Sequence, residues 1–84
     1  MFIVVQHVTE VNQIEKDGEV TGAVIVLGGR REGFTCLADR DALSMLPSVG
    51  QRVRVTARRN SWNSGSRDAP VWRENFKYQG YEPA

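Results

Sequence analysis

Residues 51–59 read Gln-Arg-Val-Arg-Val-Thr-Ala-Arg-Arg, a stretch in which small apolar side chains alternate with polar ones. Successive side chains of a β-strand point to opposite faces of a sheet. Val53, Val55 and Ala57 are therefore expected to face a core. The other face carries a row of guanidinium groups, from Arg52, Arg54 and Arg58. The stretch predicts a strand with one buried apolar face and one basic face.

The segment that follows, residues 60–70, is rich in Ser, Asn and Gly and is expected to form a loop. It contains one tryptophan, Trp62, and one arginine, Arg67. A tryptophan on a loop can stack on the bases of a nucleic acid, or it can fold back to cover a small core. Both interpretations of Trp62 remain open.

The chain has 84 residues, which is enough for one small domain over residues 1–84. Cys36 is the only cysteine and His7 the only histidine, which excludes an intrachain disulfide and a zinc site built from these residue types. The apolar neighbours of Cys36 predict a buried thiol, and a lone thiol fits a reducing, cytoplasmic setting. No apolar run approaches the roughly 18 residues of a membrane span. We expect no cofactor, no metal ion and no membrane partner.

The net charge of +1 conceals an asymmetry between the two halves of the chain. Residues 1–42 carry four basic and seven acidic side chains, whereas residues 43–84 carry seven basic and three acidic ones. Arginine, which binds phosphate through a planar fork of donors, supplies most of the basic charge. The asymmetry indicates an anionic partner, although a solvated sheet face explains the same charges.

Further strands are predicted from β-branched and alternating segments, at residues 2–14, 20–27, 32–38 and 71–78. Asp17-Gly18 is a strong signal for a hairpin turn. Gly22 lies inside a strand and indicates a bulge or a sharp coil of the sheet. The tail, residues 79–84, has no clear pattern and is expected to be irregular.

The periodicity changes at residues 39–46, which are good helix formers with Ala42, Leu43 and Leu46 on one face. Asp39 is expected to cap this helix and Pro47 to end it after two turns. The sequence therefore predicts an all-β fold in which one short helix separates the third and fourth of five strands. A five-stranded barrel with the helix covering one end would leave no open sheet edges.

This order, together with the phrase Val-Gly-Gln-Arg-Val-Arg-Val at residues 49–55, resembles the OB-fold family. Among OB-folds, small single-stranded-DNA-binding proteins are the most similar in size. The resemblance implies a ligand lying across the second and third strands, flanked by the loops at residues 15–19 and 60–70. The chain departs from this pattern in its first loop, where Glu15, Asp17 and Glu19 would repel phosphate.

Other candidate contacts lie on the third and fifth strands and on one hairpin tip. Arg30 and Arg31 form either a solvated turn or a phosphate clamp. Phe34 reaches the binding face only if Thr35 and Leu37 face the core. On the fifth strand, Trp72 and Phe76 are predicted to be core residues, which places Arg73, Asn75 and Lys77 on the opposite face.

We expect a non-catalytic protein that binds single-stranded nucleic acid, DNA or RNA, with little sequence preference. The expected contacts are Arg30, Arg31, Phe34, Arg52, Arg54, Arg58, Arg59, Trp62 and Arg67. One barrel of this size offers few contacts, so a homo-oligomer is expected as well. The alternative is a protein-interaction or assembly subunit. No nucleophile–base pair, metal cluster or paired catalytic carboxylates indicate an enzyme.

Overall fold

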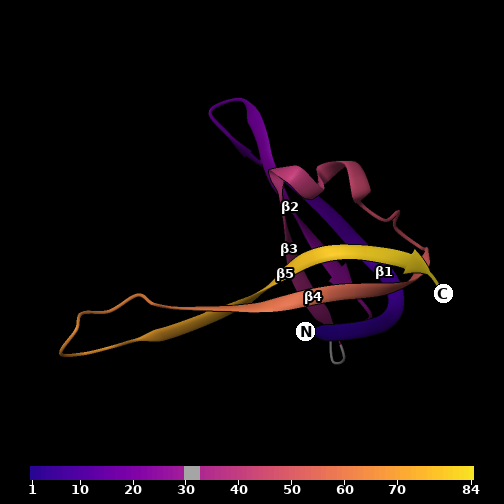
Figure 1. Cartoon of the computed structure of the whole chain (residues 1–84). Coiled ribbons are helices and arrows are strands. Elements are labelled where there is room, and N and C mark those ends of the chain that lie inside the picture. The colour runs from indigo at the N-terminus through magenta and orange to yellow at the C-terminus, as the bar shows by residue number, and fades with distance from the viewer. Residues whose placement is uncertain (30–32) are drawn as a thin grey trace.

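The structure is a computed structural model that describes residues 1–29 and 33–84. These residues form five strands and one short 3₁₀ helix, in the order β1 (Phe2–Lys16), β2 (Glu19–Leu27), β3 (Phe34–Asp39), η1 (Arg40–Met45), β4 (Arg52–Asn63) and β5 (Trp72–Pro83). The strands make one closed sheet in the order β1-β2-β3-β5-β4 (Figure 1). The predictions of an all-β fold and of a short helix between the third and fourth strands are confirmed.

The core lies inside the closed sheet and is built from the apolar face that the alternation in β4 predicted. Val53, Val55 and Ala57 are fully buried, together with Ile25 and Leu27 of β2. Cys36 is also fully buried, as the sequence predicted, and burial raises the pKa of its thiol to about 11. The thiol is therefore a small apolar core group and stays protonated at neutral pH.

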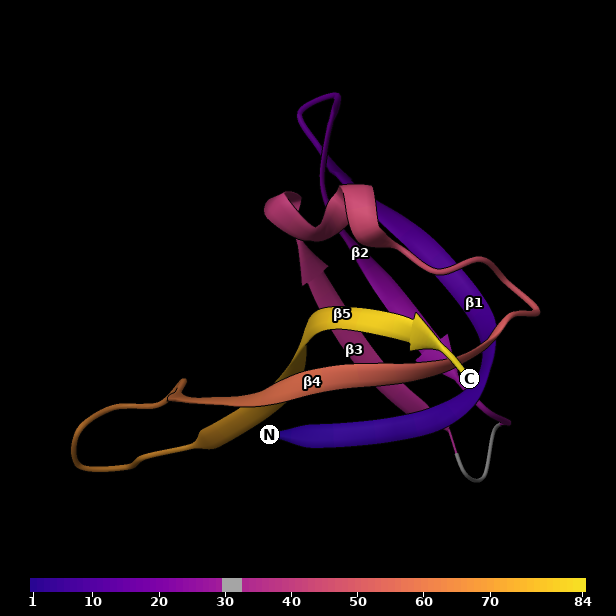
Figure 2. The ribbon, with the colours of Figure 1, turned by 45° about the vertical axis from the view of Figure 1, so that its right-hand side comes forward.

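Strand β1 closes the sheet by pairing with two different neighbours. Its first half pairs with β4, from Phe2 opposite Ala57 to His7 opposite Arg52, and its second half pairs with β2. The change of partner coincides with a register shift between Val8 and Glu10, which leaves Thr9 as the extra residue of a bulge. Bulges bend a strand and increase its twist, so β1 can curve around the barrel (Figure 2).

The β1–β2 connection is the predicted Asp-Gly turn, in which both Asp17 (φ 54°) and Gly18 (φ 81°) have positive φ. Gly22 lies at a second register shift and approaches β3 closely. A Cβ atom added to Gly22 would lie 2.6 Å from the carbonyl oxygen of Ala38. The predicted bulge or sharp coil at Gly22 is confirmed as a bulge beside it, in which Thr21 is the extra residue.

The η1 helix covers one end of the sheet, where Ala42 is buried and Leu43 and Leu46 pack against the core. The hydroxyl of Tyr78 on β5 donates a hydrogen bond to the carbonyl of Met45 and ties the helix to the sheet. Asp39 occupies the N-cap position as predicted, but its side chain makes no capping hydrogen bond. The Asp39 carboxylate instead lies 3.9 Å from the Lys77 ammonium.

Two predicted irregular segments belong to strands. The expected tail, residues 79–84, continues β5, whose backbone pairs with β4 as far as Val53 opposite Pro83. A register shift next to Gln79 and a positive φ at Gly80 interrupt the side-chain alternation and so conceal this strand in the sequence. Likewise, β4 runs on to Asn63, so that Trp62 lies on a strand and not on a loop.

Within the described part of the chain, no helix is long and apolar enough to cross a bilayer.

Candidate nucleic-acid interface

The ends of β4 and β5 form a two-stranded ribbon that projects from the closed sheet (Figures 1 and 2). We call it the arm: residues 58–63 of β4 pair with residues 72–77 of β5, and residues 64–71 form its tip. The pairing of β1 with β4 stops at Phe2 opposite Ala57, so β5 is the only described neighbour of β4 along the arm. The arm therefore exposes two faces.

The tip of the arm is held by hydrogen bonds that the sequence did not reveal. The Asn63 side-chain oxygen accepts hydrogen bonds from the backbone N–H groups of Gly65 and Val71, both at 2.9 Å. The Ser64 N–H donates to the Val71 carbonyl at 2.8 Å, and the Ala69 N–H donates to the Ser66 hydroxyl at 3.0 Å. These bonds satisfy the turn locally and continue the ribbon geometry almost to its end.

One face of the arm is basic and carries a tryptophan; we call it the Trp62 face. The register of β4 and β5 is regular along the arm, so directly opposed residues share a face. Trp62 lies opposite Arg73, and Arg58 lies opposite Lys77. Asn60 and Asn75 fill the positions between them. The predicted placement of Arg73, Asn75 and Lys77 on one face of β5 is confirmed by this register.

The opposite face of the arm, which we call the Trp72 face, continues the interior face of the sheet. Phe76 packs against the core as predicted, but the prediction that Trp72 is a core residue is wrong, because its side chain is 70% exposed. The reason is that β5 begins at Trp72 in the arm, where it pairs only with the end of β4, and joins the closed sheet further along its length. Alternation places Trp72 and Phe76 on one face but does not say where the core ends.

The Trp62 face is continuous with the outer surface of β2 and β3. Lys77 on β5 is the partner of Leu37 on β3, and Leu37 is in turn opposite Val24 on β2. The next pair along, Val26 and Thr35, lies on the same outer side. A path of half-buried apolar side chains therefore leads from the outer side of β2 and β3 to the cations and tryptophan of the arm.

The predicted arginine row is divided by the structure. Arg58 belongs to the Trp62 face, and it forms no ion pair with a described residue. Arg52 and Arg54 also point outward but lie next to β1, and Arg54 is 3.9 Å from Glu82. Arg59 lies on the Trp72 face, where its guanidinium is 2.6 Å from the Glu74 carboxylate.

The remaining predicted contacts occupy different places. The condition for Phe34 to reach the binding face is not met, since Cys36 and Ala38 face the core and Thr35 is exposed. The Phe34 ring instead packs on the Phe76 ring, with centroids 4.8 Å apart. Arg67 is exposed in the tip of the arm. Arg30 and Arg31 lie outside the described residues.

The acidic β1–β2 hairpin, a departure from the family pattern, projects from the sheet in a different direction from the arm (Figures 1 and 2). Its Glu15, Asp17 and Glu19 are exposed, and Glu19 is 3.3 Å from the Arg40 guanidinium. The hairpin therefore leaves the Trp62 face uncovered, and its charge does not neutralise the cations of the arm.

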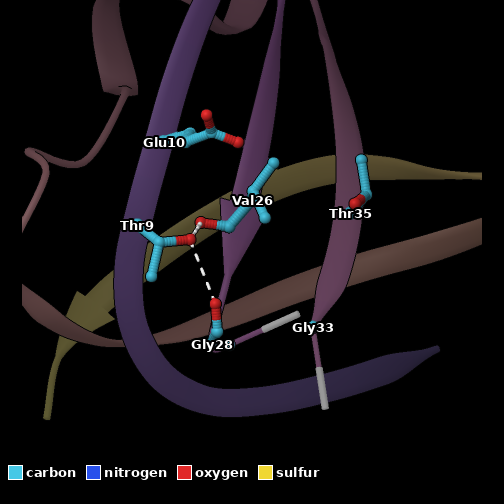
Figure 3. Close-up of a pocket in the computed structure, with 7 residues that line it drawn as sticks. Thr9, Glu10, Val26, Gly28, Gly33 and Thr35 are labelled. Carbon is cyan, nitrogen blue, oxygen red and sulfur yellow. Dashed lines mark hydrogen bonds between the residues drawn. The ribbon is translucent and has the colours of Figure 1, made fainter. Parts of the chain in front are cut away.

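A shallow hollow of about 480 Å³ lies on the outer side of the sheet, where β1, β2 and β3 meet (Figure 3). Thr9 at the bulge of β1 lines it together with Val26, Thr35 and backbone of Gly28. The Thr9 hydroxyl lies 3.1 Å from the carbonyl oxygens of both Val26 and Gly28. This hollow is not predictable from the sequence, because it depends on the bulge at Thr9 of β1, which no residue pattern indicates. The Glu10 carboxylate at its edge disfavours phosphate there.

Comparison with family models, with curated proteins and with solved structures finds no match to this chain. Among the described residues, no three His, Cys, Asp or Glu side chains gather as a metal-binding group would.

Proposed function

We propose that this chain is an OB-fold protein that binds single-stranded nucleic acid, and single-stranded DNA in particular, without catalysing a reaction. The observation that carries the proposal is the placement of Trp62, Arg73, Arg58 and Lys77 on one face of the arm. In support of the fold assignment, the strand order β1-β2-β3-β5-β4, the antiparallel hairpins and the parallel β3–β5 contact suit a five-stranded Greek-key barrel.

The physical basis is the combination of an aromatic ring with cations on one face, of which Arg58 and Arg73 form no ion pair with a described residue and Lys77 lies 3.9 Å from Asp39. Base–aromatic stacking contributes roughly 1–3 kcal/mol per base and does not depend strongly on the base. Arg73 next to the ring, and Arg58 and Lys77 farther along the same face, would bind the phosphates that connect stacked bases. The apolar path over Val24 and Leu37 extends this surface toward β2 and β3, where OB-folds bind their ligands. Single strands fit such a surface because their bases are free to stack.

A second candidate function is that of a protein-assembly subunit. It is favoured by Trp72, which is 70% exposed on the face of the arm opposite Trp62, Arg58 and Arg73. In this case the arm would contact only protein. The affinity of this chain for nucleic acid would then be no higher than that of any weakly basic protein surface.

Fluorescence anisotropy with labelled oligonucleotides separates the two functions. Single-stranded DNA, single-stranded RNA and duplex DNA are titrated with the protein over a series of salt concentrations. We expect single strands to bind more tightly than the duplex, with a log–log salt slope of about −0.7 per neutralised phosphate. Equal affinity for duplex and single strand, or affinity that does not change with salt, would refute the proposal and leave the assembly function.

A further inference from the structure

The Trp72 face of the arm has the composition of a protein interface. Trp72 is 70% exposed, and Phe2, at the barrel end of the same face, is 44% exposed. The Phe2 ring meets Phe76 edge-to-face at 5.0 Å, so this end of the face is a preformed aromatic surface. Exposed tryptophans in a fixed position are frequent energetic centres of protein interfaces. This side chain contributes little to the fold of the single chain.

The charges of this face differ from those of the Trp62 face. Its one cation, Arg59, and its one anion, Glu74, lie 2.6 Å apart, and the neighbouring Ser61 and Asn63 are neutral. A phosphate chain gains little on such a surface, because Glu74 opposes the attraction of Arg59. A surface that carries one charge of each sign is instead complementary to a rotated copy of itself.

We propose that the Trp72 face is the interface between two copies of this chain. In a two-fold arrangement each copy presents the same patch to the other. Glu74 of each copy then approaches Arg59 of the other copy, which gives two equivalent ion pairs. The two arms then pack as facing sheets, with the Trp72 side chains between them and the Trp62 faces directed outward. Isolated two-stranded ribbons are only marginally stable in water, and this packing gives each arm an apolar contact.

The first test measures association without nucleic acid, by sedimentation equilibrium of the full chain. Trp72→Ser is compared with Trp62→Ser, a matched substitution on the other face of the same ribbon. We expect the wild type and Trp62→Ser to form dimers. The dimer dissociation constant of Trp72→Ser should be higher by a factor on the order of ten or more. Circular dichroism checks that both variants fold. A monomeric wild type, or equal effects of the two substitutions, would overturn the proposal.

A second test uses charge reversal and separates a contact between copies from the ion pair within one chain. Arg59→Glu makes the face acidic, and Glu74→Arg makes it basic, so each variant alone should associate more weakly than the wild type. An equimolar mixture of the two should recover association as a heterodimer. If the mixture stays as monomeric as its components, the self-complementary interface is refuted. Neither test contains nucleic acid. If the dimer proposal fails, the proposed binding of nucleic acid is therefore not affected.

Discussion

Trp62 on β4 lies directly opposite Arg73 on β5, on the outer face of the arm. Cross-strand neighbours on one face of an antiparallel ribbon have Cβ atoms about 5 Å apart, so an aromatic ring and a guanidinium are presented side by side. Trp62 is 41% exposed and therefore has ring surface available to a base. This pair is the smallest unit of the proposed interface, in which one side chain stacks and the other binds phosphate.

Replacing Trp62 by Ala should weaken the binding of single-stranded DNA by roughly 1–3 kcal/mol, because one stacking platform is lost. The measurement is the dissociation constant from anisotropy at fixed salt. In a Trp72→Phe background, Trp62 is the only tryptophan, and its fluorescence should be quenched when oligonucleotide binds. An unchanged affinity of the Trp62→Ala variant would show that bases are not stacked there.

The salt dependence of binding should distinguish arginines on the two faces of the arm. Arg58→Gln removes a cation from the Trp62 face and should reduce the salt slope by about 0.7. Arg59→Gln is the control, because Arg59 lies on the other face at 2.6 Å from Glu74. Equal changes in slope for these adjacent arginines would contradict the assignment of faces, whereas a change confined to Arg58→Gln supports it.

The fold should be sensitive to any side chain at Gly22. A Cβ atom there would lie 2.6 Å from the Ala38 carbonyl oxygen, so Gly22→Ala should destabilise the protein by about 1–3 kcal/mol. For a domain of this size, each kcal/mol lowers the melting temperature by roughly 4–8 °C. Gly29→Ala is the control, since a Cβ atom at Gly29 meets no atom of the described residues within 4 Å. Thermal unfolding followed by circular dichroism should separate the two variants clearly.

Stability should decline at alkaline pH because two buried core groups resist ionisation. Burial raises the pKa of Cys36 from 9.0 to about 11, so between these values the unfolded chain releases a proton that the folded chain retains. Unfolding is then increasingly favoured as the pH rises. Burial, and to a lesser degree Tyr81 and Cys36, raise the pKa of Tyr78 from 10.0 to about 12, which extends the decline over that range.

The Cys36→Ala variant isolates the contribution of the thiol. Its free energy of unfolding, measured with urea at several pH values, should fall less steeply than that of the wild type from about pH 9 to about pH 11. The remaining decline above pH 10 should diminish further when Tyr78 is replaced by Phe. Parallel curves for the wild type and Cys36→Ala would mean that the thiol ionises as easily in the folded chain as in the unfolded one.

Much of the fold was predictable because local signals agreed with the tertiary structure. The Asp17-Gly18 turn needs positive φ at two successive residues, and few other residue pairs tolerate it. The alternation of Val53, Val55 and Ala57 requires one apolar face, whatever the neighbours of the strand are. The position of the short helix and its N-cap residue Asp39 followed from a change of period, although the 3₁₀ geometry and the absence of a side-chain capping bond did not.

The arm and the C-terminal half of β5 were not predictable from local patterns. Asn60 and Asn63 have low strand propensity, and residues 60–63 are extended because they pair with residues 72–75. A bulge at Gln79 and a glycine at position 80 break the alternation of β5, so its final residues resembled an irregular tail. In both places a long-range backbone pairing decides the conformation, and pairing partners cannot be read from either segment alone.

Where a strand runs without a bulge, the sequence by itself determined which side chains share a face, because alternation follows from backbone geometry alone. It placed Trp72 with Phe76, and Arg52, Arg54 and Arg58 together, correctly. Only the tertiary structure decided where each face leaves the core, because that depends on the point at which β4 and β5 run beyond the closed sheet. The same extension turned Trp62 from a loop residue into the fixed partner of Arg73.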